Sequence, residues 1–322
     1  MTIDPQAAEV LERAARANLP SYPQIGAPAA RKLYRETRGA LTPPPPEVAK
    51  VEDLEASGPA GPIPVRLYRA LGSEADERLP VLVYFHGGGW TIGDLDTHDV
   101  ICREFANLAR CAVASVDYRL APENRFPAAV EDAIAATHWI GRMGDTLGLD
   151  STRVAVGGDS SGGNLAAVVA LTLRDAGGPP LAMQVLIYPA TDMSVDRGSH
   201  LKFAAGYMLT REAIIWFTGN YLRGPDDAAD WRASPLRARD FAGVAPAYVI
   251  TAGFDPLLDE GKEYADRLHD AGVPVTYECF EGMIHGFVTM GGAIAAAHHA
   301  ISRAAGGLKQ AFARMQKKPG NI

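Results

Sequence analysis

The sequence predicts an α/β fold built on one mostly parallel β-sheet. From residue 80 onward, short continuous apolar segments alternate with longer amphipathic segments of helical length. Strands that are apolar throughout are typical of a parallel sheet whose two faces are both covered by helices. The chain has 322 residues, which is long enough to bury such a core as one unit.

The chain before residue 80 has a different pattern. Residues 5–18 and 28–39 have the apolar spacing of two short helices, and the four prolines at 43–46 predict a stiff extended spacer. Residues 47–55 and 62–69 then form two alternating segments that are joined by a turn containing glycine and proline. This arrangement predicts an antiparallel hairpin ahead of the parallel strands.

The alternating part of the chain supplies six predicted strands with helices between them. The strands are expected at 80–85, 111–118, 153–158, 183–189, 247–253 and 275–280. The helices are expected near 97–110, 128–143, from 161 onward, near 257–271 and near 293–315. In a sheet of this kind functional groups gather on the loops that follow the strands.

Residues 190–245 interrupt the alternation, because they contain no strand-like segment. A helical insertion between two strands can form a lid over a site, or it can simply thicken the core. The sequence leaves both interpretations open.

Composition and charge exclude several classes of protein. Hydrophobic residues make up 47% of the chain, charged residues 21%, and the net charge is −7 with scattered basic residues, so we expect no nucleic-acid partner. No apolar segment reaches membrane-spanning length, and the N-terminus lacks the pattern of a secretory signal. Cys102, Cys111 and Cys279 are an odd number without regular spacing, which predicts free thiols. We therefore expect a soluble, cytoplasmic protein.

A candidate nucleophile lies in the segment Gly158-Asp159-Ser160-Ser161-Gly162, which contains the pattern G-x-S-x-G. The segment follows an apolar strand and opens an alanine-rich helix, as the nucleophile elbow of the α/β-hydrolase fold requires. The flanking glycines permit a tight turn, and the helix N-terminus favours negative charge at Ser160. Ser161 is the rival nucleophile, but glycines do not flank it symmetrically. A glycine-rich turn with a helix-capping serine is the interpretation without chemistry.

A glycine-rich loop, His86-Gly87-Gly88-Gly89-Trp90, directly follows the strand at 80–85. Exposed backbone N–H groups in such a loop can bind an oxyanion. A phosphate-binding loop is disfavoured, because no Gly-Lys-Ser/Thr follows. His86 could serve as a base, but we expect it to hold the loop by a hydrogen bond.

A nucleophilic serine needs a base, and the base needs an orienting carboxylate. His285 lies in a loop just after the last predicted strand, whereas most other histidines fall on predicted helices or in the insertion. Asp255 follows the strand at 247–253, and Asp259 and Glu260 lie one helical turn further along. The order Ser160, Asp255, His285 is the order expected in this fold.

The motifs together resemble the hormone-sensitive lipase family, whose bacterial members are called family IV esterases. The resemblance rests on H-G-G-G-W, Y-R-L-A-P-E at Tyr118–Glu123, G-D-S-S-G-G, D-P-L-L-D-E at Asp255–Glu260, and H-G-F at His285–Phe287. It spans about residues 80 to 290 and implies hydrolysis of carboxylic esters, no cofactor, and a possible homodimer. A mild departure is Ser161, where the family more often has alanine.

The resemblance also implies the oxyanion-hole residues and an N-terminal cap, and the sequence pattern supplies the rest of the domain plan and the pocket residues. The N–H groups of Gly88, Gly89 and Ser161 would form the oxyanion hole. Residues 1–45 would form N-terminal cap helices, residues 46–189 and 246–322 the catalytic domain, and residues 190–245 a cap insertion. The substrate pocket is expected to include Trp90, Tyr188, Met208, Leu209, Ile214 and Phe217.

The sequence therefore predicts a serine carboxylesterase with the triad Ser160, Asp255 and His285, which acts on short- to medium-chain esters through an acyl-enzyme intermediate. Its partner is a small-molecule ester, with no membrane partner. No histidine–glutamate or cysteine cluster of metal-binding spacing occurs, so no metal is expected. The alternatives are a deacetylase or amidase acting on a small molecule, and a non-catalytic receptor of the same fold.

Overall fold

The predicted strands form a single eight-stranded sheet in the computed structural model, which describes residues 2–316. The order across the sheet is β1-β2-β4-β3-β5-β6-β7-β8. The strands are β1 (Lys50–Gly58), β2 (Gly61–Arg69), β3 (Leu79–Phe85), β4 (Ala112–Val116), β5 (Leu149–Asp159), β6 (Gln184–Ile187), β7 (Ala247–Phe254) and β8 (Val275–Ile284).

Strand pairing confirms the predicted mixture of a hairpin and a parallel sheet. β1 and β2 pair antiparallel, with Lys50 opposite Arg69, and β2 pairs antiparallel with β4. All pairs from β4 and β3 across to β8 are parallel. The carboxyl ends of six strands therefore meet at one edge of the sheet, where the loops carry the candidate residues.

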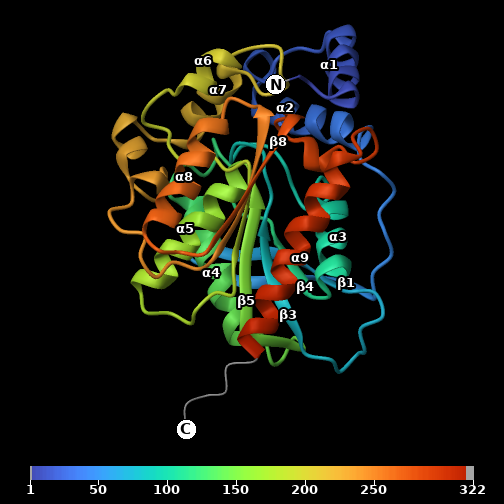
Figure 1. The fold of residues 1–322 in the computed structure, drawn as a ribbon, viewed down its shortest axis with the longest axis vertical. Coiled ribbons are helices and arrows are strands. Elements are labelled where there is room, and N and C mark those ends of the chain that lie inside the picture. Colours follow the sequence, from blue (N-terminus) through green and yellow to red (C-terminus); the bar gives the residue numbers. More distant parts are fainter. Residues whose placement is uncertain (1, 317–322) are drawn as a thin grey trace.

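Helices cover both faces of the sheet and one end of it. They are α1 (Pro5–Ala17), α2 (Tyr22–Gly39), α3 (Asp99–Ala109), α4 (Ala128–Met143), α5 (Ser161–Asp175), α6 (Gly198–Lys202), α7 (Arg211–Tyr221), α8 (Leu258–Asp270) and α9 (Ala296–Gln316). Figure 1 shows α3 and α9 along one face and α4, α5 and α8 along the other. The helices α1, α2, α6 and α7 gather at the end toward which β8 points (Figure 1). None of the helices within residues 2–316 is long and apolar enough to cross a membrane.

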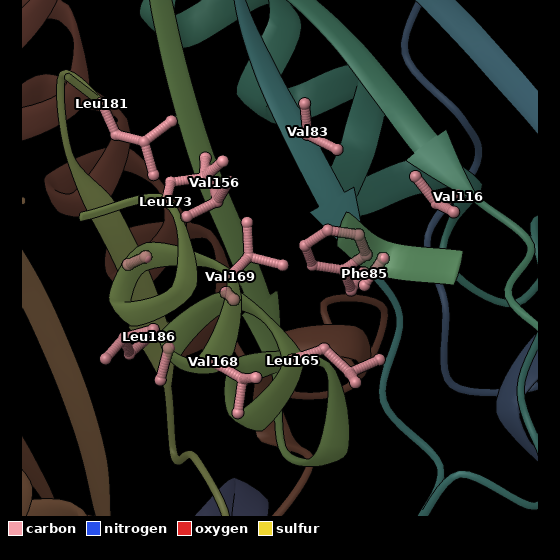
Figure 2. Close-up of a cluster of buried hydrophobic side chains, with 14 of the residues drawn as sticks. Val83, Phe85, Val116, Val156, Leu165, Val168, Val169, Leu173, Leu181 and Leu186 are labelled. Carbon is pink, nitrogen blue, oxygen red and sulfur yellow. The ribbon is translucent and has the colours of Figure 1, made fainter. Parts of the chain in front are cut away.

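The helix that follows the candidate nucleophile is fixed by the core beneath it. Leu165 and Val169 of α5 lie toward Phe85 at the end of β3 and Val156 of β5 (Figure 2). All four side chains are fully buried in one apolar cluster. Burying a side chain of this size contributes about 1.5–3 kcal/mol. This packing fixes the N-terminus of α5 against the ends of two central strands.

The N-terminal segment differs in one respect from the prediction. The second helix begins at Tyr22 rather than near residue 28, because two helical segments are joined across a kink at Gly26, which has φ 73°. Tyr34 of α2 packs with Ile92 and with Phe217 of α7 in a small apolar cluster. The N-terminal helices and the insertion are thus in direct contact above the strand ends.

Residues 190–245 contribute both to the cover over the strand ends and to the core. Their first part holds α6 and α7, and their second part holds the short 3-10 helices η1 (Pro225–Ala229) and η2 (Pro235–Arg237). Leu236 and Phe241 belong to the main apolar core, whereas Phe217 packs against α2. The segment therefore contains residues of the main core as well as a helix that packs against α2.

Candidate active site

Ser160 occupies the sharp turn between β5 and α5. Its backbone has φ 56° and ψ −119°, a conformation that is strained for a residue with a side chain. A Cβ atom on Gly158 or on Gly162 would collide with the backbone carbonyl oxygen of Phe85. Glycine is therefore required on both sides, and the turn presents the Ser160 side chain at the N-terminus of α5.

The structure brings the three predicted triad residues together from the ends of three strands. Ser160 Oγ lies 2.9 Å from His285 Nε2, and His285 Nδ1 lies 2.7 Å from Asp255 Oδ2. Asp255 is fully buried, and its other oxygen accepts a hydrogen bond of 2.8 Å from the Leu257 N–H. One carboxylate oxygen of Asp255 is thus bound by the backbone, and the other contacts the imidazole.

The rival carboxylates and the rival serine have other contacts. Asp259 Oδ2 accepts a hydrogen bond from the Ser199 N–H at 2.8 Å, and Glu260 Oε1 accepts one from the Thr191 N–H at 2.6 Å. The Ser161 hydroxyl is buried, and within residues 2–316 it has no hydrogen-bond partner.

His86 lies beneath the glycine-rich loop rather than beside Ser160. Its ring stacks on Tyr118, with the ring centroids 4.4 Å apart, and its Nδ1 lies 2.9 Å from the Gly87 carbonyl oxygen. Burial lowers the pKa of His86 to about 4, so the ring is neutral. These contacts suit a residue that holds the loop.

The glycine-rich loop presents free donors to the space above Ser160. Gly88 has φ 125° and Gly89 has φ 56°, conformations that favour glycine. Within residues 2–316 no acceptor is hydrogen-bonded to the N–H groups of Gly88, Gly89 or Ser161. All three residues line the same cavity as Ser160. This is the arrangement that an oxyanion hole requires.

Asp159 connects the nucleophile turn to the glycine-rich loop, a role that the sequence reasoning missed. Its Oδ1 accepts hydrogen bonds from the Gly87 N–H at 3.0 Å and from the Tyr84 hydroxyl at 2.9 Å. Burial raises the pKa of Asp159, but the nearby His98, 3.2 Å away, and the Tyr84 hydroxyl outweigh burial and lower it. The position of Asp159 directly before Ser160 is the feature of the sequence that could have indicated this role.

A cavity of about 380 Å³ opens above Ser160 and His285. Of the residues expected in the pocket, five line it, namely Trp90, Met208, Leu209, Ile214 and Phe217. Tyr188 is not in the lining, because it is fully buried and its ring packs against the His285 imidazole, with the centroids 4.6 Å apart. Tyr188 is therefore a buried neighbour of His285 and not part of the cavity lining.

A second histidine–carboxylate pair lines the same cavity and was also missed. His200 Nε2, from α6, lies 3.2 Å from Glu260 Oε2, and both residues are buried. The two residues are 60 positions apart and lie on segments without a shared motif, so no sequence signal pointed to the pair. Within residues 2–316 no group of three or more histidine, cysteine or acidic side chains is arranged to hold a metal ion.

Comparison with known proteins decides the family. A sequence model for proteins of the α/β hydrolase fold matches residues 82–289. The chain belongs to this α/β hydrolase family. It is similar to the carboxylic ester hydrolase LipN of Mycobacterium tuberculosis, with 48% identity over 270 residues, which cover 80% of this chain and 71% of LipN. It is also similar to an ethyl acetate hydrolase of Pseudomonas putida, with 37% identity over 96% of this chain and 99% of that enzyme.

A solved structure agrees with these relatives. The ester hydrolase EH1AB1, from the metagenome of Lake Arreo, superposes on this α/β hydrolase with a TM-score of 0.93. The two sequences are 44% identical, and the match covers 97% of this chain and all of that chain. The protein is a carboxylic ester hydrolase of the hormone-sensitive lipase type, as the sequence motifs predicted.

Proposed function

We propose that this carboxylesterase hydrolyses short- to medium-chain esters with Ser160 as nucleophile, His285 as base and Asp255 as the orienting carboxylate. The observation that carries the proposal is the continuous chain of two hydrogen bonds, 2.9 Å from Ser160 to His285 and 2.7 Å from His285 to Asp255. These lengths are those of well-formed hydrogen bonds.

Acylation begins when Ser160 Oγ attacks the ester carbonyl carbon and His285 Nε2 takes the hydroxyl proton. Asp255 holds the Nδ1 proton of the imidazole, so that Nε2 is the nitrogen free to accept, and it stabilises the imidazolium that forms. His285 then gives its proton to the oxygen of the leaving alcohol, and the bond between that oxygen and the carbonyl carbon breaks. The acyl group stays on Ser160.

Deacylation repeats these steps with water as the nucleophile. His285 takes a proton from water, the hydroxide oxygen attacks the acyl carbon, and the proton returns to Ser160 Oγ as the carboxylic acid leaves. In both steps the negative oxygen would meet the free N–H groups of Gly88, Gly89 and Ser161. Losing one such donor typically costs about 3 kcal/mol of transition-state stabilisation.

The chain-length preference follows from the side chains that close the cavity. Met208, Leu209 and Phe217 form part of its apolar wall, and the cavity has a volume of about 380 Å³. Each further methylene of the acyl chain gains about 0.8 kcal/mol of burial until the wall is reached. Acyl chains of about two to eight carbons, the length implied by the family resemblance, should therefore be preferred.

The test is a series of 4-nitrophenyl esters from acetate to palmitate, assayed with the wild-type enzyme and with Ser160→Ala. The wild-type enzyme should have its highest kcat/KM at butyrate or nearby, and the variant should be inactive on every ester. Faster hydrolysis of palmitate than of butyrate would overturn the chain-length proposal. Activity that survives in Ser160→Ala would overturn the nucleophile.

Two further properties belong to the proposal. All three cysteines are free thiols in the structure, which suits a reducing compartment such as the cytoplasm. The resemblance to family IV esterases favours a homodimer. Light scattering on the purified enzyme would decide the second point, since a monomeric mass at micromolar concentration would contradict it.

A further inference from the structure

Arg38 is a charged side chain in the active-site cavity that the ester hydrolysis described above does not use. It lies near the C-terminus of α2, and its guanidinium carbon is 5.0 Å from the centroid of the Tyr34 ring. Its Nη1 donates one long hydrogen bond of 3.3 Å to the carbonyl oxygen of Gly286, the residue after His285. Arg38 therefore lies on the cavity wall directly beside the loop that carries the proposed base.

Arg38 differs from the two other arginines of its helix. Arg31 pairs with Glu123 at 2.6 Å, and Arg35 pairs with Asp94. Within residues 2–316 no carboxylate oxygen lies within 4.0 Å of the Arg38 guanidinium. A guanidinium has five N–H donors, and Arg38 uses one of them in its contact with Gly286.

The other charged groups that line the cavity are already paired. Two of its carboxylates, Asp192 and Asp196, contact Arg197 and Arg211 respectively. The other two carboxylates are Glu260, whose partner is His200, and Asp159, whose partner is His98. The remaining basic side chain, His285, is hydrogen-bonded to Asp255. Arg38 is thus the basic group of the described cavity lining that has no carboxylate partner.

Two phenol hydroxyls lie in the same part of the wall. Tyr22 and Tyr34 both line the cavity and both interact electrostatically with Arg38. Burial raises the pKa of Tyr22 to about 12 and also raises the pKa of Tyr34. Both hydroxyls therefore stay protonated at neutral pH and can donate hydrogen bonds. Arg38, Tyr22 and Tyr34 therefore offer donors to the cavity. The Asp159 carboxylate also interacts electrostatically with Arg38, but its Oδ1 already accepts hydrogen bonds from the Tyr84 hydroxyl and the Gly87 N–H.

A partly buried charge without a partner is costly, and its cost is offset when an opposite charge binds. We propose that Arg38, assisted by Tyr22 and Tyr34, binds a carboxylate that the ester substrate carries in addition to its scissile bond. The inference rests on the proposed function and names its substrate class: monoesters of dicarboxylic acids, or acyl esters of hydroxy acids. Such a carboxylate would lie against the Arg38 guanidinium.

The experiment compares matched esters that differ only in charge. On the acyl side, monoethyl glutarate is compared with its neutral amide isostere, ethyl 4-carbamoylbutanoate, by following ethanol release. On the alcohol side, acetoxyacetate is compared with acetoxyacetamide by following acetate release. For each pair the measured quantity is the ratio of kcat/KM for the charged ester to kcat/KM for the neutral ester. Any effect common to both esters cancels in this ratio.

The variants are Arg38→Met, which keeps the apolar stem and removes the charge, and Arg38→Lys, which keeps a charge. Arg35→Met is the matched control, because Arg35 lies on the same helix but contacts Asp94 outside the cavity lining. In at least one pair the wild-type ratio should be about tenfold or more, as expected for a charge-assisted hydrogen bond. Arg38→Met should bring that ratio to one or below, Arg38→Lys should restore part of it, and Arg35→Met should leave it unchanged.

Two results would overturn the inference without affecting the proposed function. One is a wild-type ratio of one or less in both pairs. The other is an Arg38→Met variant that slows charged and neutral esters equally, which would make Arg38 a support for the His285 loop. If the folded wild-type enzyme hydrolysed neither these esters nor the 4-nitrophenyl esters, the proposed function and the inference would fail together.

Discussion

Two histidine–carboxylate pairs meet at one cavity, and we propose a catalytic role for only one of them. His285 lies 2.7 Å from Asp255, and His200 lies 3.2 Å from Glu260. All four residues are buried, and both histidines line the cavity. Residue type, burial and pairing are therefore shared between the two pairs.

The difference lies in the second nitrogen of each ring. His285 Nε2 faces the Ser160 hydroxyl at 2.9 Å, whereas His200 Nδ1 accepts a hydrogen bond of 2.9 Å from the Arg197 backbone N–H. A base must have a free lone pair within reach of the proton it removes. In His200 that lone pair is already occupied by the backbone.

The two carboxylates also hold different parts of the molecule. Asp255 accepts a hydrogen bond from Leu257, two residues further along its own loop. Glu260 accepts hydrogen bonds from the N–H groups of Thr191 at 2.6 Å and Asp192 at 3.3 Å, which open the insertion. The His200–Glu260 pair therefore attaches both ends of the segment 191–200 to α8. We therefore expect a histidine–carboxylate pair to act in catalysis only where a third group faces the histidine, and we expect the His200–Glu260 pair to hold the segment 191–200 in place.

The largest expected difference between the pairs is in catalysis. Asp255→Asn should fold but favour the wrong imidazole tautomer, and kcat on 4-nitrophenyl butyrate should fall by up to ~10⁴-fold. Glu260→Gln, the matched change in the second pair, should keep most of the activity. Steady-state kinetics on both variants, with circular dichroism as the folding control, measures this. Comparable losses in the two variants would remove the distinction between the pairs.

Activity should depend on pH through the base that faces Ser160. A protonated imidazole cannot accept the Ser160 proton, so kcat/KM should fall in acid, by about tenfold for each pH unit once that form dominates. Glu260→Gln should leave the shape and midpoint of this profile in place, because His200 takes no proton from the nucleophile. Profiles of both proteins from pH 4.5 to 9 would show this. A profile that is flat in acid would exclude a histidine base.

The main effect of Glu260→Gln should be on stability. In Glu260→Gln the side-chain amide oxygen can still accept a hydrogen bond from the Thr191 N–H. The contact between the carboxylate and His200 is lost, so the free energy of unfolding should fall by about 1–3 kcal/mol. Glu263→Gln is the matched control on the same helix, since Glu263 contacts Arg197 at 2.9 Å and its side chain is half exposed. Because one partner of this pair is half exposed to solvent, we expect its contribution to be about 0–1 kcal/mol, as for a surface ion pair. Urea unfolding of both variants is the measurement, and equal losses would contradict this role of the His200–Glu260 pair.

The Asp255–His285 pair could be predicted because each residue lies in a recognisable local pattern of the sequence. Ser160, Asp255 and His285 each follow a recognisable strand, and the carboxyl ends of parallel strands meet at one edge. The turn at Ser160 is also forced locally, by glycines that a larger residue could not replace. Local pattern also predicted the strands, their mostly parallel pairing and the hairpin.

The His200–Glu260 pair and the position of Arg38 depend on packing between segments that are distant in the chain. Such packing leaves no periodic pattern in the sequence. His200 lies in the five-residue helix α6, and its contact with Glu260 spans 60 positions. Tyr188 was predicted in the pocket, but its backbone has φ 34° and its ring lies against the imidazole. Chain position indicated the correct edge of the sheet, whereas side-chain direction was set by contacts with distant segments.

Asp259 gives the smallest expected effect and the sharpest test of the triad assignment. It lies four residues after Asp255 in the first turn of α8, where its charge complements the helix dipole, and it accepts a hydrogen bond of 2.8 Å from the Ser199 N–H. Asn at this position can still accept that bond, so the loss is mainly the charge, about 0.3–1 kcal/mol of stability. Its kcat/KM on 4-nitrophenyl butyrate should equal that of the wild-type enzyme. Asp255→Asn makes the same chemical change, from a carboxylate to an amide. The two variants therefore differ only in whether the carboxylate that is removed is the one facing His285. An inactive Asp259→Asn beside an active Asp255→Asn would reverse the assignment.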